Sequence, residues 1–282
     1  MLYSTSEIRE FATGLDHPEG VAVGRDGTVY AGGEAGQVYQ ISSDGKHVET
    51  IANTGGFCLG ITLDREENIY VCDCGKRVVF KVSPSRQVSV FADSCGGQGF
   101  KNPNFSAFDS RGNLYFSDSG DWKKRNGVVF RAEPDGKTSL FAEGPFHFPN
   151  GLAMDAEERY LYLVESNLDR VLRIEIKSDG RAGTPELYAD ALASVPDGLA
   201  FDARGNLYVT TYGSSCIYRV SPDRSVDLLC QDIESEFLCL VTNCAFAGPN
   251  FDQLLAANLG HHHLAILDLK VKGQPLAHHR RG

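Results

Sequence analysis

The sequence predicts an all-β fold, a six-bladed β-propeller that forms one domain over residues 1–282. Two observations lead to this prediction. A short segment of alternating apolar residues with a polar turn recurs six times, and its copies begin at Gly20, Gly60, Phe105, Gly151, Gly198 and Cys244. These starts are 40 to 47 residues apart, and that period fits four short strands per unit, as in a propeller blade.

Each unit is expected to contain four strands joined by turns. In the fifth unit, apolar segments at 199–201 and 207–210 flank a turn at 203–206, and two further strands follow at 216–220 and 226–230. When the residues that lead into each first strand are included, the blades are expected to begin near residues 17, 57, 102, 148, 195 and 241.

The two ends of the chain predict how the ring closes. Residues 8–12 resemble an outermost strand but precede the first unit, whereas the sixth unit stops after a third strand at 264–269. The N-terminal strand is therefore expected to complete the sixth blade, which removes exposed sheet edges. Residues 277–282, rich in His and Arg, are expected to form a solvated tail. A β-sandwich is the alternative fold, but a sandwich does not require self-similarity at a fixed period.

Composition excludes several classes of protein. The 27 Lys and Arg residues against 37 Asp and Glu give a net charge of −10, which works against binding to nucleic acid. No apolar run reaches the ~20 residues of a membrane span, and no apolar signal segment is visible near the start. We therefore expect a cytoplasmic protein that is a monomer or a weak homo-oligomer, with neither nucleic acid nor membrane as a partner.

The eight cysteines form no CxxC pair and no dense disulfide framework. Cys72 and Cys74 form a CxC pattern, which on a strand points both thiols to one face. The pair is expected to be buried as two small apolar residues. Binding of a soft metal ion is the alternative.

One position of the repeat carries mostly polar residues. The position just before each innermost strand is occupied by Glu19, Leu59, Asn104, Asn150, Asp197 and Asn243. The pseudo-symmetry of a propeller brings these six positions together around the channel axis at one end. Two carboxylates and three amides, with no His or Cys among them, form a ligand set that favours Ca²⁺, with Mg²⁺, Mn²⁺ or Zn²⁺ as alternatives.

The alternative interpretation is that these residues only form turns, because Asp or Asn before Gly is a common turn former. That interpretation explains Asn150 and Asp197. It does not explain Glu19, which is not a turn former and follows Pro18 at the same repeat position. We therefore expect one divalent metal ion at the mouth of the channel, with Glu19, Asn104, Asn150 and Asp197 as its ligands.

The loops after each second strand are expected on the same face as this ring, since adjacent antiparallel strands reverse direction. The third unit has the longest of these loops, with the only tryptophan and three basic residues, and it is either a lid or a solvated turn. The candidate pocket walls are Glu34, Asp73, Asp118, Trp122, Glu165, Tyr212, His261, His262 and His263. We expect substrate to contact Trp122, Tyr212 and His262, together with Asn102 and Asn104.

Four segments resemble the gluconolactonase or regucalcin (senescence marker protein) family, a family of six-bladed propellers. They are residues 18–20 (PEG), 148–153 (FPNGLA), 196–200 (PDGLA) and 242–249 (TNCAFAGP). The resemblance covers nearly the whole chain, in order and at blade spacing. It implies a calcium-dependent hydrolase of sugar lactones or similar small esters.

The resemblance also implies roles for particular residues. Those matching Glu19, Asn150 and Asp197 hold the metal ion in that family, and the one matching Asn104 lies against metal and substrate. The sequence departs from the family pattern at two positions. Sugar-lactone members often carry Arg where this chain has Asn102, and Asp is usual where this chain has Phe105, directly after Asn104. The implied substrate is therefore a small lactone rather than gluconolactone in particular.

The resulting hypothesis is metal-assisted hydrolysis of a small lactone. Asp197 is interpreted as the general base for water, with direct nucleophilic attack as the alternative, and Glu19 as the residue that fixes the charge and position of the metal ion. Two other hypotheses stay open: the same site acting on a phosphotriester or in a condensation, and a non-catalytic propeller with a structural ion or a partner-binding face. The carboxylate pair favours an enzyme, because an interaction propeller has no need for it.

Overall fold

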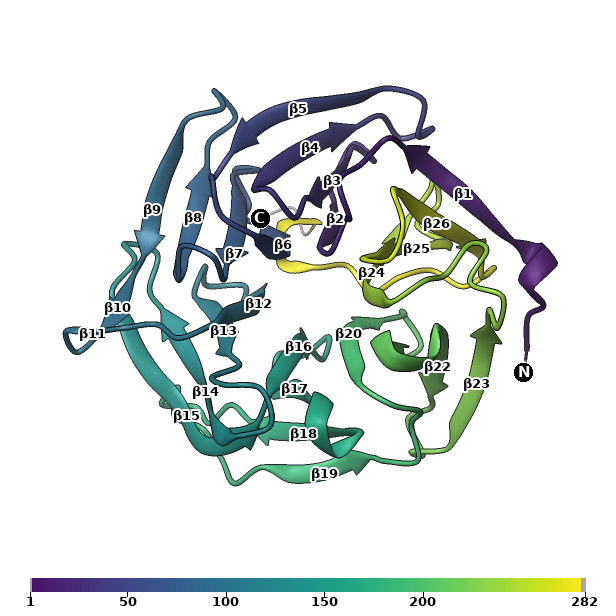
Figure 1. Cartoon of the computed structure of the whole chain (residues 1–282). Coiled ribbons are helices and arrows are strands. Elements are labelled where there is room, and N and C mark those ends of the chain that lie inside the picture. Colours follow the sequence, from purple (N-terminus) through teal and green to yellow (C-terminus); the bar gives the residue numbers. More distant parts are fainter. Residues whose placement is uncertain (1, 280–282) are drawn as a thin grey trace.

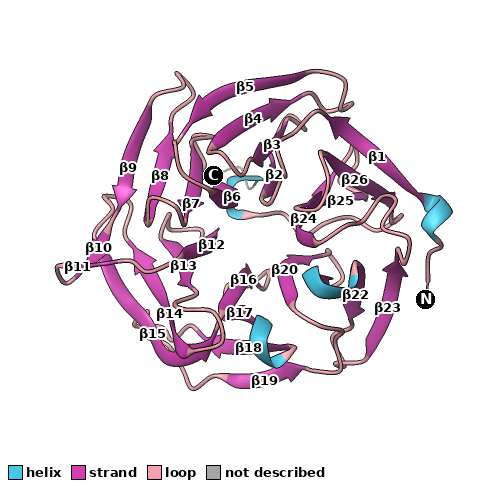
Figure 2. Cartoon of the chain, in the orientation of Figure 1, coloured by secondary structure: helices cyan, strands magenta, loops and turns pink. Residues whose placement is uncertain are grey.

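The structure is a computed structural model that describes residues 2–279. It consists of six four-stranded antiparallel sheets arranged in a ring around a central channel (Figure 1). The predicted six-bladed β-propeller is confirmed. Figure 2 shows that helical structure is confined to short turns, which are η1 (Thr5–Glu7), η2 (Ser166–Leu168), η3 (Tyr212–Ser214) and η4 (Ala277–His279). Within residues 2–279 no helix is long and apolar enough to cross a membrane.

Each blade runs from an inner strand at the channel to an outer strand at the rim (Figure 1). Blade 1 contains β2 (Val21–Val23), β3 (Val29–Gly32), β4 (Gln37–Ile41) and β5 (Val48–Asn53). Blade 2 contains β6 (Cys58–Leu63), β7 (Ile69–Asp73), β8 (Val78–Val82) and β9 (Val88–Ala92). A small hairpin of β10 (Ser94–Cys95) and β11 (Gln98–Gly99) follows it.

The remaining blades keep the same strand order. Blade 3 contains β12 (Pro103–Phe108), β13 (Leu114–Asp118), β14 (Arg125–Ala132) and β15 (Thr138–His147). Blade 4 contains β16 (Pro149–Met154), β17 (Tyr160–Glu165), β18 (Arg170–Glu175) and β19 (Glu186–Ala189). Blade 5 contains β20 (Pro196–Phe201), β21 (Leu207–Thr211), β22 (Cys216–Val220) and β23 (Val226–Gln231).

The sixth blade is built from both ends of the chain, as predicted. It contains β24 (Val241–Ala247), β25 (Gln253–Asn258), β26 (His263–Asp268) and the N-terminal strand β1 (Ile8–Thr13). Strand β1 pairs antiparallel with β26, with Ile8 opposite Leu267. The closure therefore joins residues that are more than two hundred positions apart, and it covers the edge that β26 would otherwise expose.

The turns between inner and second strands explain why the repeat carries Asp and Gly at fixed places. In blade 5, the Asp202 carboxylate accepts hydrogen bonds from the backbone N–H groups of Arg204 and Asn206 at 2.8 and 2.9 Å. Gly205 between them adopts φ of +82°, a conformation that favours glycine. Because Asp and Gly each meet one geometric need of this turn, the motif recurs in the sequence.

The glycine that follows the ring position lets neighbouring blades approach closely. A Cβ atom on Gly151 would overlap the backbone carbonyl oxygen of Asp197 in the next blade, and one on Gly198 would lie 2.7 Å from the Cα of Asn243. Each inner strand therefore packs directly against the ring residue of its neighbour. This packing determines how near the ring side chains are to one another.

Replacing Gly151 with Ala is expected to destabilise the protein by about 1–3 kcal/mol, because the added methyl group must displace backbone that has no space to move. The matched control is Gly99→Ala, whose Cβ would find its nearest atom, the carbonyl oxygen of Asp93, at 3.8 Å. Urea denaturation of both variants measures the difference in free energy of unfolding. Equal stabilities would show that the blades do not need a glycine here.

The prediction of a solvated tail over residues 277–282 is wrong for the part that the structure describes. Residues 272–279 form a C-terminal strap that crosses the centre of the ring, the yellow segment in Figure 1. Ala277 and His278 are buried, with 9% and 2% of their surface exposed. The strap follows the last strand and has no counterpart in the repeat, so the pattern could not place it. Residues 280–282 lie outside the described residues.

Hydrogen bonds hold the strap to the ends of inner strands from several blades. The backbone N–H of Gln274 donates to the carbonyl oxygen of Phe201 in blade 5 at 2.9 Å. Its side-chain amide donates to Met154 in blade 4, also at 2.9 Å. The Nε2 atoms of His278 and His279 lie 2.9 and 3.0 Å from the carbonyl oxygen of Val23 in blade 1. The strap thus connects blades on opposite sides of the channel.

Candidate active site

Five polar side chains of the repeat position are buried at the beginning of the inner strands, at the end of the channel opposite the strap. Glu19, Asn104, Asn150, Asp197 and Asn243 each expose 5% of their surface or less. The sixth position is Leu59, which is also buried. We call the five polar residues the polar ring.

The members of the polar ring interact around the channel. The Nδ2 of Asn243 lies 3.3 Å from a carboxylate oxygen of Glu19 and donates to the Glu19 backbone carbonyl at 3.0 Å. The charge of Asp197 acts on Glu19, and the amide of Asn150 acts on Asp197. Asn104 is connected to this group through the Ser119 hydroxyl, which receives a hydrogen bond from the Asn104 Nδ2 at 2.9 Å. The sequence-predicted ligand set is therefore one connected cluster.

Buried hydroxyl groups connect the ring positions of adjacent blades. The hydroxyls of Ser119 and Ser166 each donate, at 2.7 Å, to the carbonyl oxygen of the proline that precedes the next ring residue. Thr242 donates at 2.7 Å to the backbone carbonyl of Glu19, which links blade 6 to blade 1. These positioning residues were not predicted. The available signal was the acidic residue followed by Ser at 118–119 and again at 165–166.

Four oxygen atoms of the polar ring are buried and have no hydrogen-bond partner among residues 2–279. They are the Oδ1 atoms of Asn104, Asn150, Asp197 and Asn243. Buried polar atoms are nearly always satisfied, so four orphans in one cluster indicate a missing ligand. Carboxylate and amide oxygens are the donors that Ca²⁺ prefers. The residues present therefore fit a hard divalent cation.

The fit depends on the amide oxygens. Within residues 2–279 no three His, Cys, Asp or Glu side chains are grouped so as to hold a metal ion. The polar ring offers two carboxylates, Glu19 and Asp197, and its other donors are amides. A site of this composition suits Ca²⁺ better than Zn²⁺, which takes nitrogen and sulfur ligands more readily.

The electrostatics of the carboxylate pair point the same way. Burial raises the pKa of Asp197 to about 7, against the effect of the nearby Asn150 amide. Burial, followed by the charge of Asp197, raises the pKa of Glu19 well above its ordinary value, and Asn243 lowers it. No positive side chain in the described part of the chain contributes to either shift. The pair is a buried negative site without a counter-charge, which a cation would neutralise.

The residues expected to contact substrate lie at different distances from the polar ring. Tyr212 is its neighbour, since the charges of Asp197 and Glu19 help to raise the pKa of Tyr212 after the larger effect of burial. Trp122 is 47% exposed, and its ring packs edge-on against Phe148 at 4.7 Å between centroids. Trp122 is thus joined to the loop that leads into β16 and Asn150.

Asn102 and His262 make other contacts. The backbone N–H of Asn102 donates to Asp118 at 2.9 Å, and the ring of His262 lies 4.4 Å from that of His17, with its Nδ1 at 2.9 Å from the carbonyl oxygen of Leu15. Within residues 2–279 no hydrogen bond joins the side chains of Asn102, Trp122 or His262 to the polar ring. The contribution of these three residues to substrate binding stays a prediction.

Three acidic candidates for the pocket wall make hydrogen bonds that hold the backbone in place. Asp73, Asp118 and Glu165 end the second strands of blades 2, 3 and 4, and each is almost completely buried. Their carboxylates accept hydrogen bonds from backbone N–H groups of the segment that leads into the inner strand of the same blade. They therefore hold the approach to the polar ring in place. Of the two cysteines predicted to be buried, Cys72 is buried and Cys74 is only partly buried, and all eight cysteines are free.

The sequence matches the models of two known protein families. The family model described as "SMP-30/Gluconolactonase/LRE-like region" matches residues 35–257. The chain belongs to this family. A second model, for the N-terminal part of strictosidine synthase-like proteins, matches residues 10–41.

Members of the SMP-30/gluconolactonase family resemble the chain in sequence and in fold. A gluconolactonase of Zymomonas mobilis is 35% identical over 187 residues, which are 58% of this chain and 51% of that protein. The chain thus spans about half the length of this relative. A gluconolactonase of Xanthomonas campestris superposes with a TM-score of 0.80 at 20% identity, over 93% of this chain and 89% of the other.

A third similar protein is the regucalcin of Agrobacterium tumefaciens, described as a calcium-binding protein. It superposes with a TM-score of 0.80 at 16% identity, over 100% of this chain and 99% of the other. At these identities the superpositions establish the shared propeller fold.

Proposed function

We propose that the chain is a hydrolase of small lactones that uses one divalent cation, Ca²⁺ in the first place, held by the polar ring. The observation that carries the proposal is the cluster of four orphaned buried oxygens beside two carboxylates without a counter-charge. Relatives described as gluconolactonases support the substrate class. The regucalcin relative, described as calcium-binding, supports the choice of cation.

Glu19, Asn104, Asn150 and Asp197 would hold the cation, with Asn243 beside Glu19. When bound, the cation supplies Lewis-acid polarisation of the lactone carbonyl and charge stabilisation of the oxyanion. Asn243 and Thr242 hold Glu19 through its side chain and its backbone carbonyl, respectively. Glu19 thereby provides a fixed negative charge at a fixed place.

Asp197 is the proposed general base. One of its carboxylate oxygens has no hydrogen-bond partner in residues 2–279, so it is available to accept a proton from a water molecule that attacks the lactone carbonyl. The Asn150 side chain is held by a hydrogen bond from its Nδ2 to the Ser166 hydroxyl at 3.3 Å. Its Oδ1 has no partner within residues 2–279 and is therefore available to the cation. Tyr212, as a neighbour of both carboxylates, is the residue best placed to contact substrate.

The proposal is tested by a hydrolysis screen with the metal-free protein. After treatment with EDTA, the protein is expected to be inactive, to bind one Ca²⁺ per chain by calorimetry, and then to hydrolyse at least one aldonolactone or aliphatic lactone. Aryl esters and phosphotriesters in the same screen distinguish the alternative hydrolase activities. If the protein binds none of Ca²⁺, Mg²⁺ and Mn²⁺ stoichiometrically, the proposed metal site is wrong. If the metal-loaded protein is inactive on all four classes of substrate, the hypothesis of a non-catalytic propeller is favoured.

A pair of matched variants tests the site itself. Asn150→Leu removes an orphaned amide oxygen with little change in volume and is expected to weaken Ca²⁺ binding at least tenfold. Asn113→Leu changes another buried Asn, whose amide bonds to Asp109 in a turn between β12 and β13, and it is expected to leave Ca²⁺ affinity unchanged. Equal Ca²⁺ affinity in both variants would contradict the assignment of Asn150 as a ligand.

A further inference from the structure

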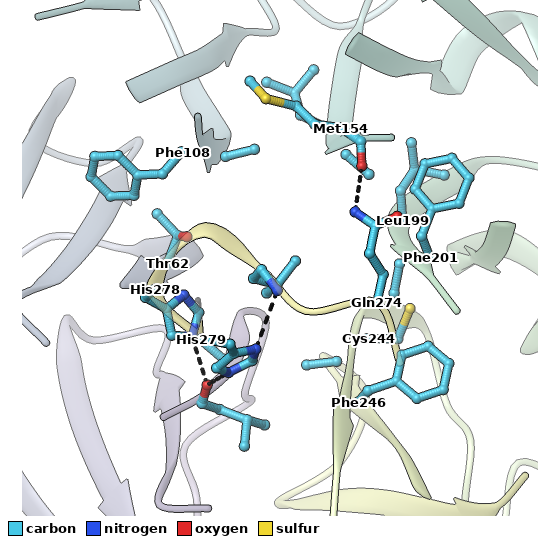
Figure 3. Close-up of a pocket in the computed structure, with 18 of the residues that line it drawn as sticks. Thr62, Phe108, Met154, Leu199, Phe201, Cys244, Phe246, Gln274, His278 and His279 are labelled. Atoms are coloured by element: carbon cyan, nitrogen blue, oxygen red, sulfur yellow. Dashed lines mark hydrogen bonds between the residues drawn. The ribbon is translucent and has the colours of Figure 1, made fainter. Parts of the chain in front are cut away.

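A cavity lies at the end of the channel away from the polar ring, between the inner strands and the C-terminal strap (Figure 3). Its volume is about 100 Å³. It begins directly below the polar ring, since Leu152 and Leu199 on its wall follow the ring residues by two positions. The strap residues Gln274 and His278 complete the wall on the far side. We call this cavity the lower chamber.

The repeat explains why there is empty space here. Three positions after the ring residue, five of the six inner strands carry a small side chain, and all five line the chamber: Ala22, Thr62, Ala107, Ala153 and Ala200. The sixth equivalent is Phe246, whose Cβ faces the backbone of Gly273 in the strap so closely that a side chain on Gly273 would overlap it. Small residues at one repeat position therefore create the chamber, and the strap covers it.

The charged groups on the wall are already engaged. Asp155 accepts hydrogen bonds from the backbone of its own turn, and Glu158 accepts two from Ser110. Burial lowers the pKa of His278 to about 3, and burial also lowers that of His279. Both histidines are therefore neutral at physiological pH. Among the described residues of the wall no cationic group is available to an anion, and both carboxylates already accept hydrogen bonds from neighbouring groups. The chamber therefore favours a neutral ligand.

One polar group on the wall has only a weak partner among the described residues. The hydroxyl of Ser106 is buried, at 2% exposure, and its polar neighbour within residues 2–279 is the thiol of Cys72, a weak hydrogen-bonding group. Most of the remaining wall is hydrocarbon, including Phe108, Met154 and Phe201 (Figure 3). A buried hydroxyl that has only a thiol as its partner, in an otherwise apolar cavity, indicates a ligand with one polar atom.

We propose that the lower chamber is a binding site for a small neutral molecule that is mostly hydrocarbon and carries at most one polar group, which the Ser106 hydroxyl meets. The site is separate from the polar ring in position and in chemistry. It takes uncharged apolar ligands on the strap side of the channel, whereas the polar ring takes a hard cation at the mouth. A dry apolar cavity of comparable size binds benzene or xenon in other proteins.

The sequence provides a direct reporter for this site. It contains only two methionines, Met1 and Met154, and Met154 lines the chamber at 7% exposure. In the full-length protein with isotope-labelled methionine methyl groups, xenon and 1-butanol are expected to shift the Met154 signal saturably, while butyrate, of similar size but charged, is not. Absence of a saturable shift with both neutral probes, or an equal response to butyrate, would overturn the proposal.

Variants separate occupation of the chamber from non-specific effects. Ala153→Leu fills the chamber and is expected to abolish the response to both probes; Ala107→Val is the milder replacement if the first variant does not fold. Ala35→Leu, at an exposed loop position, is the control and should respond as the native protein does. Ser106→Ala is expected to weaken 1-butanol binding roughly 2- to 10-fold, the range of one hydrogen bond, without affecting xenon. Persistence of binding in both filled variants would place the ligand elsewhere and refute the site.

Discussion

Asp197→Asn is expected to abolish lactone hydrolysis and to stay inactive at saturating metal ion. The substitution keeps the size of the side chain and one carbonyl-type oxygen, but an amide is not a useful proton acceptor. Removal of a general base typically costs roughly 10²–10⁴-fold in rate. The measurement is kcat against metal concentration on the best lactone that the screen provides.

Glu19→Gln is the matched variant for this experiment. Its position is held by Asn243 and Thr242 through contacts that an amide can keep in part, and its proposed task is to provide charge for the cation. It should therefore weaken metal affinity while recovering much of its kcat when metal is added. If Asp197→Asn recovers as fully as Glu19→Gln, Asp197 is only a ligand and the general-base assignment fails.

Removal of either end of the chain is expected to have the largest effect on stability. Deletion of residues 8–12 takes away the outer strand of blade 6 and leaves β26 as an exposed edge, so we expect loss of cooperative unfolding. A chain that ends at Leu269 loses the strap and its contacts with blades 1, 4 and 5, and we expect a melting temperature well below that of the full chain. Differential scanning calorimetry measures both. If the chain that ends at Leu269 melts at the same temperature as the 282-residue chain, the strap does not contribute to stability.

The strap also makes a specific contribution to pH dependence. His278 has a folded-state pKa lowered to about 3 by burial and by the charge of His279, with Arg25 acting in the same direction, whereas its ordinary value is 6.5. Below pH 6.5 His278 binds a proton in the unfolded chain but not in the folded chain. The free energy of unfolding therefore falls as pH decreases toward 3. The part of the acid sensitivity that comes from His278 should disappear in the strapless chain.

The repeat predicts most of the fold because similar residues occupy equivalent turn and inner-strand positions in the different blades. The Asp at position 202 recurs in blades 2 to 4 and the Gly at position 205 recurs in blades 1 and 3, because both favour the geometry of this turn. The ring positions can be aligned across blades without knowledge of the structure. The closing strand is recognisable because residues 8–12 resemble the outer strands of other blades. Self-similarity therefore predicts both the blades and the position at which their inner strands converge.

What the sequence could not predict lies outside the repeat or depends on single atoms. The strap occurs once, and its bonds go to backbone carbonyls such as those of Met154 and Val23, which leave no trace in the sequence pattern. The hydroxyl links from Ser119 and Ser166 occur in only two units. Asp118 and Glu165 are predicted as pocket residues from their place near the mouth, and the sequence could not show that they also accept hydrogen bonds from backbone N–H groups.

The positions of the two ends have a practical consequence for handling the protein. The N-terminal end of the described chain lies at the outside of the ring, where Leu2 bonds to β23 of blade 5, while the strap ends near the centre (Figure 1). A fusion partner or affinity tag placed ahead of η1 would start from open surface. One attached closely after His279 would act directly on the strap, which is held to Val23 and covers the chamber. Tags, surface immobilisation and force probes should therefore be attached through the N-terminal side.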